Sequence, residues 1–232
     1  MTTVPTDTRE LEPHETYVHG HHWRNLKQET EAAKLGMWLF LSTEILLFAG
    51  FFCAYGVFRA LYPGTWAAAS HHYLDWRIGG FNTIVLLVSS FTIVMAIRGA
   101  TLGNKRMMVT NLLITNVCAG IFLVLKLWLE YWPKWQKGEL PGANFSYAGH
   151  ATGPHAYTPT SHDNIFLSIY WLATATHGFH VLVGMFVIGW ATIKAAKGHF
   201  GPRRYIFLEN VGLYWHIVDV IWIFLFPLLY LV

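Results

Sequence analysis

The sequence predicts an all-α integral membrane protein, built as a bundle of five transmembrane helices. Hydrophobic residues make up 54% of the 232 residues and charged residues only 12%, about half the charged fraction of a globular domain. The few charges cluster between five long apolar runs. An aromatic content of 16% excludes an intrinsically disordered chain, and two cysteines exclude a disulfide scaffold.

Each apolar run is long enough to cross a bilayer as a helix, which needs about 20 residues. The runs do not alternate between apolar and polar residues, as the strands of a membrane barrel would. The predicted helices cover residues 35–61, 78–99, 106–131, 164–195 and 204–231. We expect one transmembrane domain, 35–232, after a polar tail, 1–34. A long outer loop, 132–163, follows Pro133, which is expected to end the third helix.

The distribution of basic residues predicts the orientation of the helices. Eleven Lys and Arg residues lie in the tail and in the second and fourth connections, against four on the opposite side. Because positive residues stay on the cytoplasmic side, we expect a cytoplasmic N-terminus and a C-terminus outside. The first 34 residues lack an apolar core, so no cleavable signal peptide is predicted. A net charge of +3 gives no reason to expect a nucleic-acid partner.

Glu44 is an ionisable residue near the middle of the first helix. It lies about 13 Å from the start of the helix at a rise of 1.5 Å per residue. A charge in hydrocarbon costs free energy, and no Lys or Arg lies at a comparable depth on another helix. We therefore expect a protonated carboxyl, or one hydrogen-bonded to a neighbouring helix. A proton-linked role and a purely structural hydrogen bond both remain open.

The last two helices contain further polar residues. His177 and His180 are expected to share a face of the fourth helix. On the fifth helix, Glu209 and His216 are seven residues apart, and Asp219 lies about 60° further round. Three histidines with a carboxylate could bind a metal in principle. The spacing suits a polar network between helices better, so no metal site is predicted.

Glu130 is expected to belong to the same intramembrane polar network, near the outer end of the third helix. Lys126 precedes it by one helical turn. An i,i+4 ion pair or snorkelling of Lys126 to the membrane surface would explain these charges. Eight further histidines lie in polar connections and are expected to be solvated; they are His19, His21, His22, His71, His72, His150, His155 and His162.

Four glycines predict close contacts between helices. Small residues let transmembrane helices approach each other, and the apolar runs contain Gly120, Gly178, Gly184 and Gly189. This pattern supports helix packing but identifies no partner.

Three segments together resemble the haem–copper oxidase subunit III family. Residues 36–55, GMWLFLSTEILLFAGFFCAY, look like the helix that carries the family's membrane-embedded glutamate, with Glu44 at that position. Residues 173–184, ATATHGFHVLVG, are similar to the family's ATGFHGLHVIIG. Residues 214–230, YWHIVDVIWIFLFPLLY, closely resemble its C-terminal signature, YWHFVDVVWLFLY. The resemblance covers about residues 35–232 in order, while the tail and the outer loop find no counterpart.

The resemblance implies an accessory subunit with no catalytic residue and no haem or copper of its own. Such a subunit packs on subunit I, beside subunit II, and these partners carry the haem and copper. It stabilises subunit I and supports its proton uptake during oxygen reduction in an aa3-type cytochrome c oxidase. The chain resembles the short five-helix bacterial form, which implies the bacterial plasma membrane. Membrane lipids, a bound phospholipid and a respiratory supercomplex are further expected partners, although two helices of the lipid-holding cleft are missing.

Three alternatives remain at this stage. The first keeps the fold and places the chain in a quinol oxidase or a nitric-oxide-reductase-associated complex. A copper-binding subunit II among its neighbours would instead indicate a cytochrome c oxidase. The second is an independent proton channel or transporter built around Glu44, which an inverted repeat would favour. The third is a membrane metalloenzyme that uses His177, His180, His216 and Asp219, which metal analysis would reveal.

Overall fold

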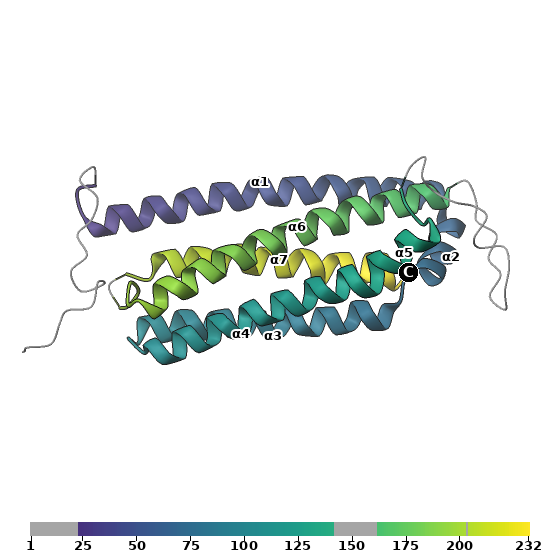
Figure 1. Ribbon diagram of the computed structural model, residues 1–232. Coiled ribbons are helices and arrows are strands. Elements are labelled where there is room, and N and C mark those ends of the chain that lie inside the picture. Colours follow the sequence, from purple (N-terminus) through teal and green to yellow (C-terminus); the bar gives the residue numbers. More distant parts are fainter. Residues whose placement is uncertain (1–22, 142–161, 203) are drawn as a thin grey trace, which may run out of the picture.

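The computed structural model describes residues 23–141, 162–202 and 204–232. All of its long elements are helices (Figure 1). Five of these elements are long and apolar enough to cross a membrane, so the predicted all-α architecture is confirmed. They are α1 (Leu26–Leu61), α3 (Trp76–Thr101), α4 (Lys105–Leu125) with its continuations η1 (Lys126–Tyr131) and α5 (Trp132–Lys137), α6 (Asp163–Ala196) and α7 (Ile206–Tyr230). The orientation of the termini across a membrane stays a prediction.

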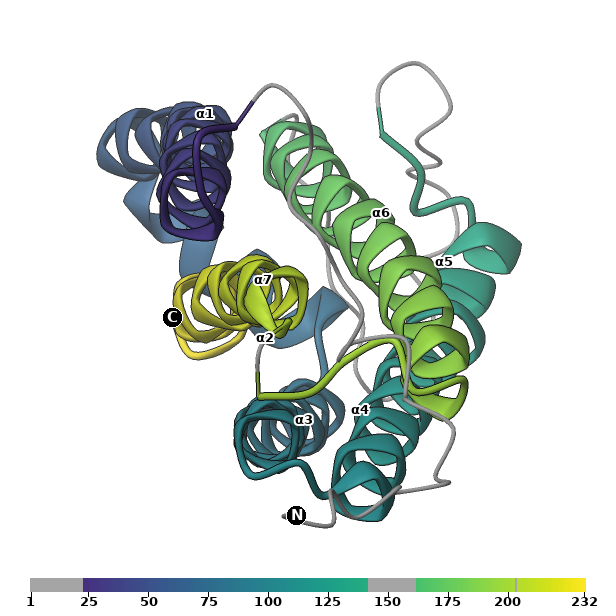
Figure 2. The ribbon, with the colours of Figure 1, turned by 90° about the vertical axis from the view of Figure 1, so that its left-hand side faces the viewer.

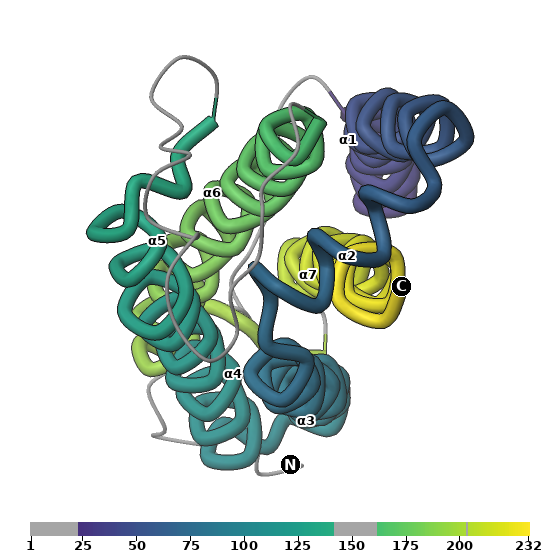
Figure 3. Tube along the Cα trace, turned by 90° about the vertical axis from the view of Figure 1, so that its right-hand side faces the viewer, coloured from purple at the N-terminus to yellow at the C-terminus, as the bar shows by residue number. Residues whose placement is uncertain are grey.

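Helix α7 lies at the centre of the bundle and packs against α1, α3 and α6 (Figures 2 and 3). Helices α3 and α4 form the most extensive helix pair, and α4 also packs on α6. Large aromatic side chains fill the space between these four helices. Trp215, Trp222, Tyr170 and Phe122 are completely buried. The four helices α3, α4, α6 and α7 therefore share one core.

Helix α1 stands at the edge of this core and contacts it through a narrow seam. Its buried residues, Leu41, Phe48 and Tyr55, are spaced seven apart and so lie on one face. Only 11% of its most apolar 18 residues are buried, against 50% in α7. Most of the apolar surface of α1 therefore faces outward.

Helix α1 also begins earlier than predicted, at Leu26. Asn25 is the N-cap, and its side chain accepts a hydrogen bond of 2.8 Å from the backbone N–H of Gln28. Glu29 lies in the first turn, where a negative charge favours the helix. Residues 26–34, expected to belong to the polar tail, are thus helical. A helix of 36 residues spans about 54 Å, well beyond the apolar core of a bilayer.

A short helix that the apolar pattern did not predict, α2 (Pro63–Tyr73), connects α1 to α3. Pro63 lies at its first turn, where no backbone N–H is required. Its Ser70 hydroxyl donates a hydrogen bond of 2.7 Å to the carbonyl of Leu229 at the end of α7. The hydroxyl of Tyr55 in α1 donates a hydrogen bond to the preceding carbonyl of α7, that of Leu228. The last carbonyls of a helix lack partners within it, so α1 and α2 together cap α7.

The prediction that Pro133 ends the third helix is wrong. Residues Lys126–Tyr131 form a π-helical turn, and the chain continues as α5 to Lys137. Pro133 lies in the first turn of α5, where the missing N–H is tolerated. The helix ends instead at Gly138, whose φ of 72° is the left-handed conformation that favours glycine.

Only one of the four glycines expected at close helix contacts occupies such a position. A Cβ on Gly184 of α6 would lie 2.7 Å from the ring of Trp215 on α7. Nothing lies within 4 Å of the corresponding position on Gly120 or Gly178, and the nearest atom to Gly189 is 3.6 Å away. The indole of Trp215 therefore requires Gly184, while the other three glycines are not needed for packing.

Candidate functional site

Glu44 of α1 is hydrogen-bonded to His180 of α6. Its Oε2 lies 2.7 Å from His180 Nε2, and the two side chains are only 15% and 14% exposed. The other ring nitrogen, Nδ1, lies 2.7 Å from the carbonyl oxygen of Thr176. Of the two expectations for Glu44, the structure shows the hydrogen bond to a neighbouring helix, and His180 is the partner.

The hydrogen bond to Thr176 limits the protonation states of the pair. A carbonyl oxygen only accepts hydrogen bonds, so His180 Nδ1 must carry a hydrogen. If the imidazole is neutral, Nε2 accepts from a protonated Glu44 carboxyl. If both groups are ionised, Nε2–H donates to the Glu44 carboxylate. The two states differ only in the position of one proton, so the pair can hold a proton and move it between helices.

The pair lies within the seam that attaches α1 to the bundle. Glu44 follows Leu41 by three residues and precedes Phe48 by four, so it shares their face. The ring of Phe48 packs edge-on against the His180 ring, with centroids 5.4 Å apart. From α7, the Tyr214 hydroxyl donates a hydrogen bond of 3.0 Å to the His180 carbonyl. Three helices, α1, α6 and α7, therefore position the pair.

His177, three residues before His180, faces different helices. Its ring is completely buried, stacks on Trp222 of α7 at 5.1 Å and meets Phe122 of α4 edge-on at 5.6 Å. Neither ring nitrogen has a hydrogen-bond partner. His177 and His180, which were expected to share a face of the helix, therefore have different surroundings: His177 packs among aromatic rings, and His180 binds Glu44.

The predicted link between His216 and its carboxylates is also absent. His216 Nδ1 lies 2.8 Å from the Ser90 hydroxyl of α3. Asp219 is 3% exposed, and neither of its carboxyl oxygens has a hydrogen bond. The described ranges contain no group of three or more His, Cys, Asp or Glu side chains that could hold a metal. The four residues of the metalloenzyme alternative are thus not brought together.

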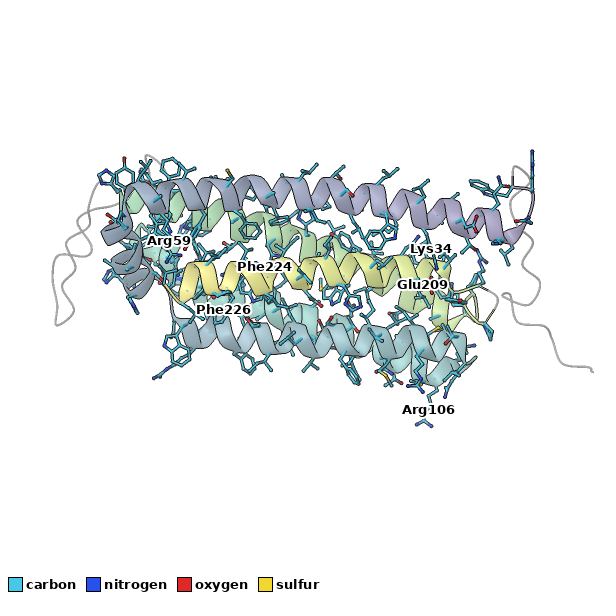
Figure 4. All side chains as sticks on the ribbon, turned by 180° about the vertical axis from the view of Figure 1, so that it is seen from behind. Lys34, Arg59, Arg106, Glu209, Phe224 and Phe226 are labelled. Carbon is cyan, nitrogen blue, oxygen red and sulfur yellow. The ribbon has the colours of Figure 1, made fainter. Side chains whose placement is uncertain are left out.

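Glu209, expected in the intramembrane polar network, forms an ion pair with Lys34 of α1 (Figure 4). Lys34 Nζ lies 2.8 Å from Glu209 Oε2, and the side chains are 46% and 26% exposed. Both line a cavity of about 810 Å³ between the ends of α1, α6 and α7. Basic and aromatic side chains contribute to its wall, among them Lys27, Lys194, Arg204, Trp190 and Phe207.

Glu130 belongs to a buried cluster at the other end of the bundle. Lys126 Nζ lies 2.6 Å from Glu130 Oε2, which confirms the i,i+4 pair, but Lys126 is only 2% exposed, so it does not snorkel. The hydroxyls of Tyr170 and Tyr230 also donate to Glu130 Oε2. The Lys126 ammonium lies about 5 Å from the rings of Tyr170, Trp222 and Tyr230. Neither tyrosine was predicted, because they lie 40 and 100 residues beyond Glu130 along the chain.

The connection histidines divide into three groups. His71 is exposed, as expected. His72 and His162 are partly buried, the first against Tyr73 and the second against Tyr62, with ring centroids 3.9 Å apart in the second pair. The others lie outside the described residues; they are His19, His21, His22, His150 and His155.

Comparisons with known proteins give one consistent result. The family model described as cytochrome c oxidase subunit III matches residues 6–137 and 144–232. Cytochrome c oxidase subunit 3 of Dugong dugon and that of Prototheca wickerhamii are each 31% identical over 217 residues, covering 91% of this chain and 72% of the relative. The protein of the same name from Gallus gallus is 28% identical over 222 residues, or 93% and 74% of the two chains. The match also includes most of the tail and outer loop, which were expected to have no counterpart.

Proposed function

Because the chain belongs to the cytochrome c oxidase subunit III family, we propose that it is the non-redox accessory subunit of a bacterial aa3-type oxidase. In this role it packs on subunit I beside subunit II in the plasma membrane, with its N-terminus in the cytoplasm. It stabilises subunit I and supports proton uptake during oxygen reduction. Haem and copper belong to the partner subunits, and subunit II binds the electron donor, cytochrome c.

The observation that carries the proposal is the bond between Glu44 and His180. It is a proton-sharing pair inside the apolar part of the bundle, with side chains about 15% exposed. It lies in the narrow seam of the least buried helix. A proton held there is close to the apolar surface of α1, which needs a lipid or protein neighbour. Such a position suits a group that assists proton movement in an adjoining subunit better than a self-contained channel.

The cavity beside Lys34 and Glu209 supports a bound phospholipid as part of the same proposal. Its basic side chains suit an anionic headgroup, and Trp190 and Phe207 suit the adjoining glycerol and acyl groups. The lipid would fill the space between α1 and the ends of α6 and α7. It would therefore reinforce the attachment of the loosely packed helix.

Replacement of Glu44 by Gln in the purified complex tests the proposal. Gln keeps a hydrogen bond to His180 but cannot give up a proton. We expect Glu44→Gln to retain the subunit in the complex, to slow proton uptake and to hasten inactivation during turnover. Ser42→Ala, which removes an exposed hydroxyl of the same helix that bonds the Trp38 carbonyl, is the matched control and should turn over as the wild type does. Normal proton uptake and normal survival during turnover in Glu44→Gln would contradict the proton-linked role.

A further inference from the structure

Four closely spaced rings, those of Trp171, Tyr131, Tyr170 and Tyr230, form an aromatic row beside Glu130. Between ring centroids, Tyr170 lies 6.4 Å from Tyr230 and 6.3 Å from Trp171. Tyr131 lies 6.5 Å from Tyr170 and 4.3 Å from Trp171. Phenol and indole rings are the side chains of a protein core that most readily lose one electron. Rings this close to each other can pass an electron along the aromatic row.

Two phenols of the aromatic row share one carboxylate oxygen as their hydrogen-bond acceptor. The Tyr170 hydroxyl donates a hydrogen bond of 2.7 Å to Glu130 Oε2, and the Tyr230 hydroxyl donates to the same oxygen. A phenol that loses an electron becomes a strong acid, so it needs an acceptor for its proton when it is oxidised. Glu130 already accepts from both hydroxyls and is therefore positioned to take that proton.

Other phenols of the bundle have weaker acceptors or lie outside the aromatic row. The Tyr55 hydroxyl donates to the backbone carbonyl of Leu228, which is a very weak base. The Tyr73 hydroxyl donates to the Asp163 carboxylate, but over 3.1 Å and outside the row. Tyr170 and Tyr230 thus combine two features, namely redox-active neighbours and a shared carboxylate.

Two buried lysines determine how strong an oxidant the aromatic row requires. Lys126 Nζ lies 5.0 Å from the centre of the Tyr170 ring and 5.1 Å from that of Tyr230. Lys134 Nζ lies 5.3 Å from the Tyr170 ring. A positive charge this close to a ring makes the removal of an electron from it more costly. We therefore expect the row to react with strong one-electron oxidants and not with ordinary electron carriers.

We propose that Tyr170, Tyr230 and Glu130 form a one-electron redox site. Trp171 and Tyr131, which are only partly buried, connect it to the edge of the bundle. A strong one-electron oxidant such as the carbonate radical takes an electron from Trp171 and leaves as carbonate. Tyr170 then returns an electron to Trp171, while its O–H bond breaks and the proton passes to Glu130 Oε2. The products are a neutral phenoxyl radical, the restored tryptophan and a neutral carboxyl.

The site holds the oxidising equivalent in a form that can be reversed. One electron from a reductant such as ascorbate returns the radical to the phenolate, which takes the proton back from Glu130. Neighbouring side chains of the core are thereby spared oxidation. An oxygen-reducing neighbour would be a source of strong oxidants, so this use of the site rests on the proposed function, whereas its redox chemistry does not.

Light-driven oxidation of the protein, purified with the subunits that accompany it, tests the radical. A ruthenium(III) trisbipyridine complex generated by a flash is the oxidant, and electron paramagnetic resonance detects tyrosyl radicals. We expect Tyr170→Phe combined with Tyr230→Phe to lose a tyrosyl signal that the wild type shows. Tyr55→Phe is the matched control and should keep it, because the Tyr55 ring also neighbours a tryptophan, Trp66 at 5.7 Å, but its hydroxyl donates to a carbonyl. The complete wild-type signal in the double variant would overturn the proposal.

The rate at which this radical forms tests the role of Glu130. Glu130→Gln keeps a hydrogen-bond acceptor but removes the base, so we expect radical formation to slow by roughly a hundredfold, the scale of a positioned proton-transfer group. Glu31→Gln removes an exposed acid that pairs with Lys27 and should form the radical at the wild-type rate. The wild type itself should form it more slowly in D₂O, because the phenolic O–H bond breaks in the same step.

A wild-type rate in Glu130→Gln, or equal rates in H₂O and D₂O, would overturn the assignment of Glu130 as proton acceptor. The ruthenium complex takes the place of an oxygen-reducing neighbour as the source of oxidant. The radical can therefore fail to form while the proposed function stands, and it can form normally in a chain that belongs to no oxidase.

Discussion

At the residue scale, the sequence identified Glu44 as a carboxyl that must be either protonated or hydrogen-bonded to a neighbouring helix, but it did not identify His180 as the partner. The cost of a carboxylate in hydrocarbon follows from the apolar run around it. His180 lies 136 residues away on another helix, and the face that α6 presents to α1 depends on how the whole bundle packs. The same reason explains why His177 and His216 were grouped with His180, although each contacts a different helix.

The buried pair of Lys126 and Glu130 gives a prediction at this scale. Glu130→Ala leaves the Lys126 ammonium without its counter-ion in a site where its side chain is 2% exposed. Removal of one partner of a buried pair costs roughly 3–5 kcal/mol, so we expect this loss in the free energy of unfolding in detergent. Lys126→Met combined with Glu130→Leu removes both charges and should cost much less. The exposed pair of Lys27 and Glu31 supplies the control, since Glu31→Ala should not change stability measurably. Equal stability of Glu130→Ala and the wild type would show that the Lys126–Glu130 pair does not contribute to the free energy of unfolding.

At the element scale, the apolar runs predicted the five long helices, because a helix that crosses the hydrocarbon core of a bilayer needs about 20 consecutive apolar residues. The parts that were not predicted lie at or beyond the ends of those apolar runs. The first turn of α1 depends on the Asn25 cap, α2 caps the end of α7, and Pro133 lies in the first turn of α5. These features depend on local capping and on contacts between helices, and neither can be predicted from the hydropathy of a run.

Two glycines of α6 allow a matched test of helix packing. Gly→Ala in an open helical position stabilises by roughly 0.5–1 kcal/mol, so Gly178→Ala, with nothing within 4 Å, should raise thermal stability slightly. Gly184→Ala would bring a methyl group 2.7 Å from Trp215. Overpacking typically costs about 1–3 kcal/mol, so this variant should unfold at a lower temperature. The opposite sign, or the same shift in both variants, would mean that α6 and α7 are not in tight contact here.

At the scale of the whole molecule, the bundle has one well-packed side and one loosely held helix. Helices α3, α4, α6 and α7 share a core of buried aromatic residues, while α1 is attached by Leu41, Phe48 and Tyr55. The hydrogen-bonded pair of Glu44 and His180 lies in that attachment. This arrangement fits a subunit that is completed by neighbours, and family membership identifies the oxidase as the source of those neighbours.

Purification of the tagged chain from its native membrane in mild detergent, followed by subunit identification and haem and metal analysis, tests this account most directly. We expect the chain to copurify in a fixed ratio with a haem- and copper-containing subunit I and a copper-containing subunit II. After separation from them, the chain itself should contain no haem, copper or other stoichiometric metal. A chain that is isolated without these subunits, or that retains a redox group among its own side chains, would contradict the account.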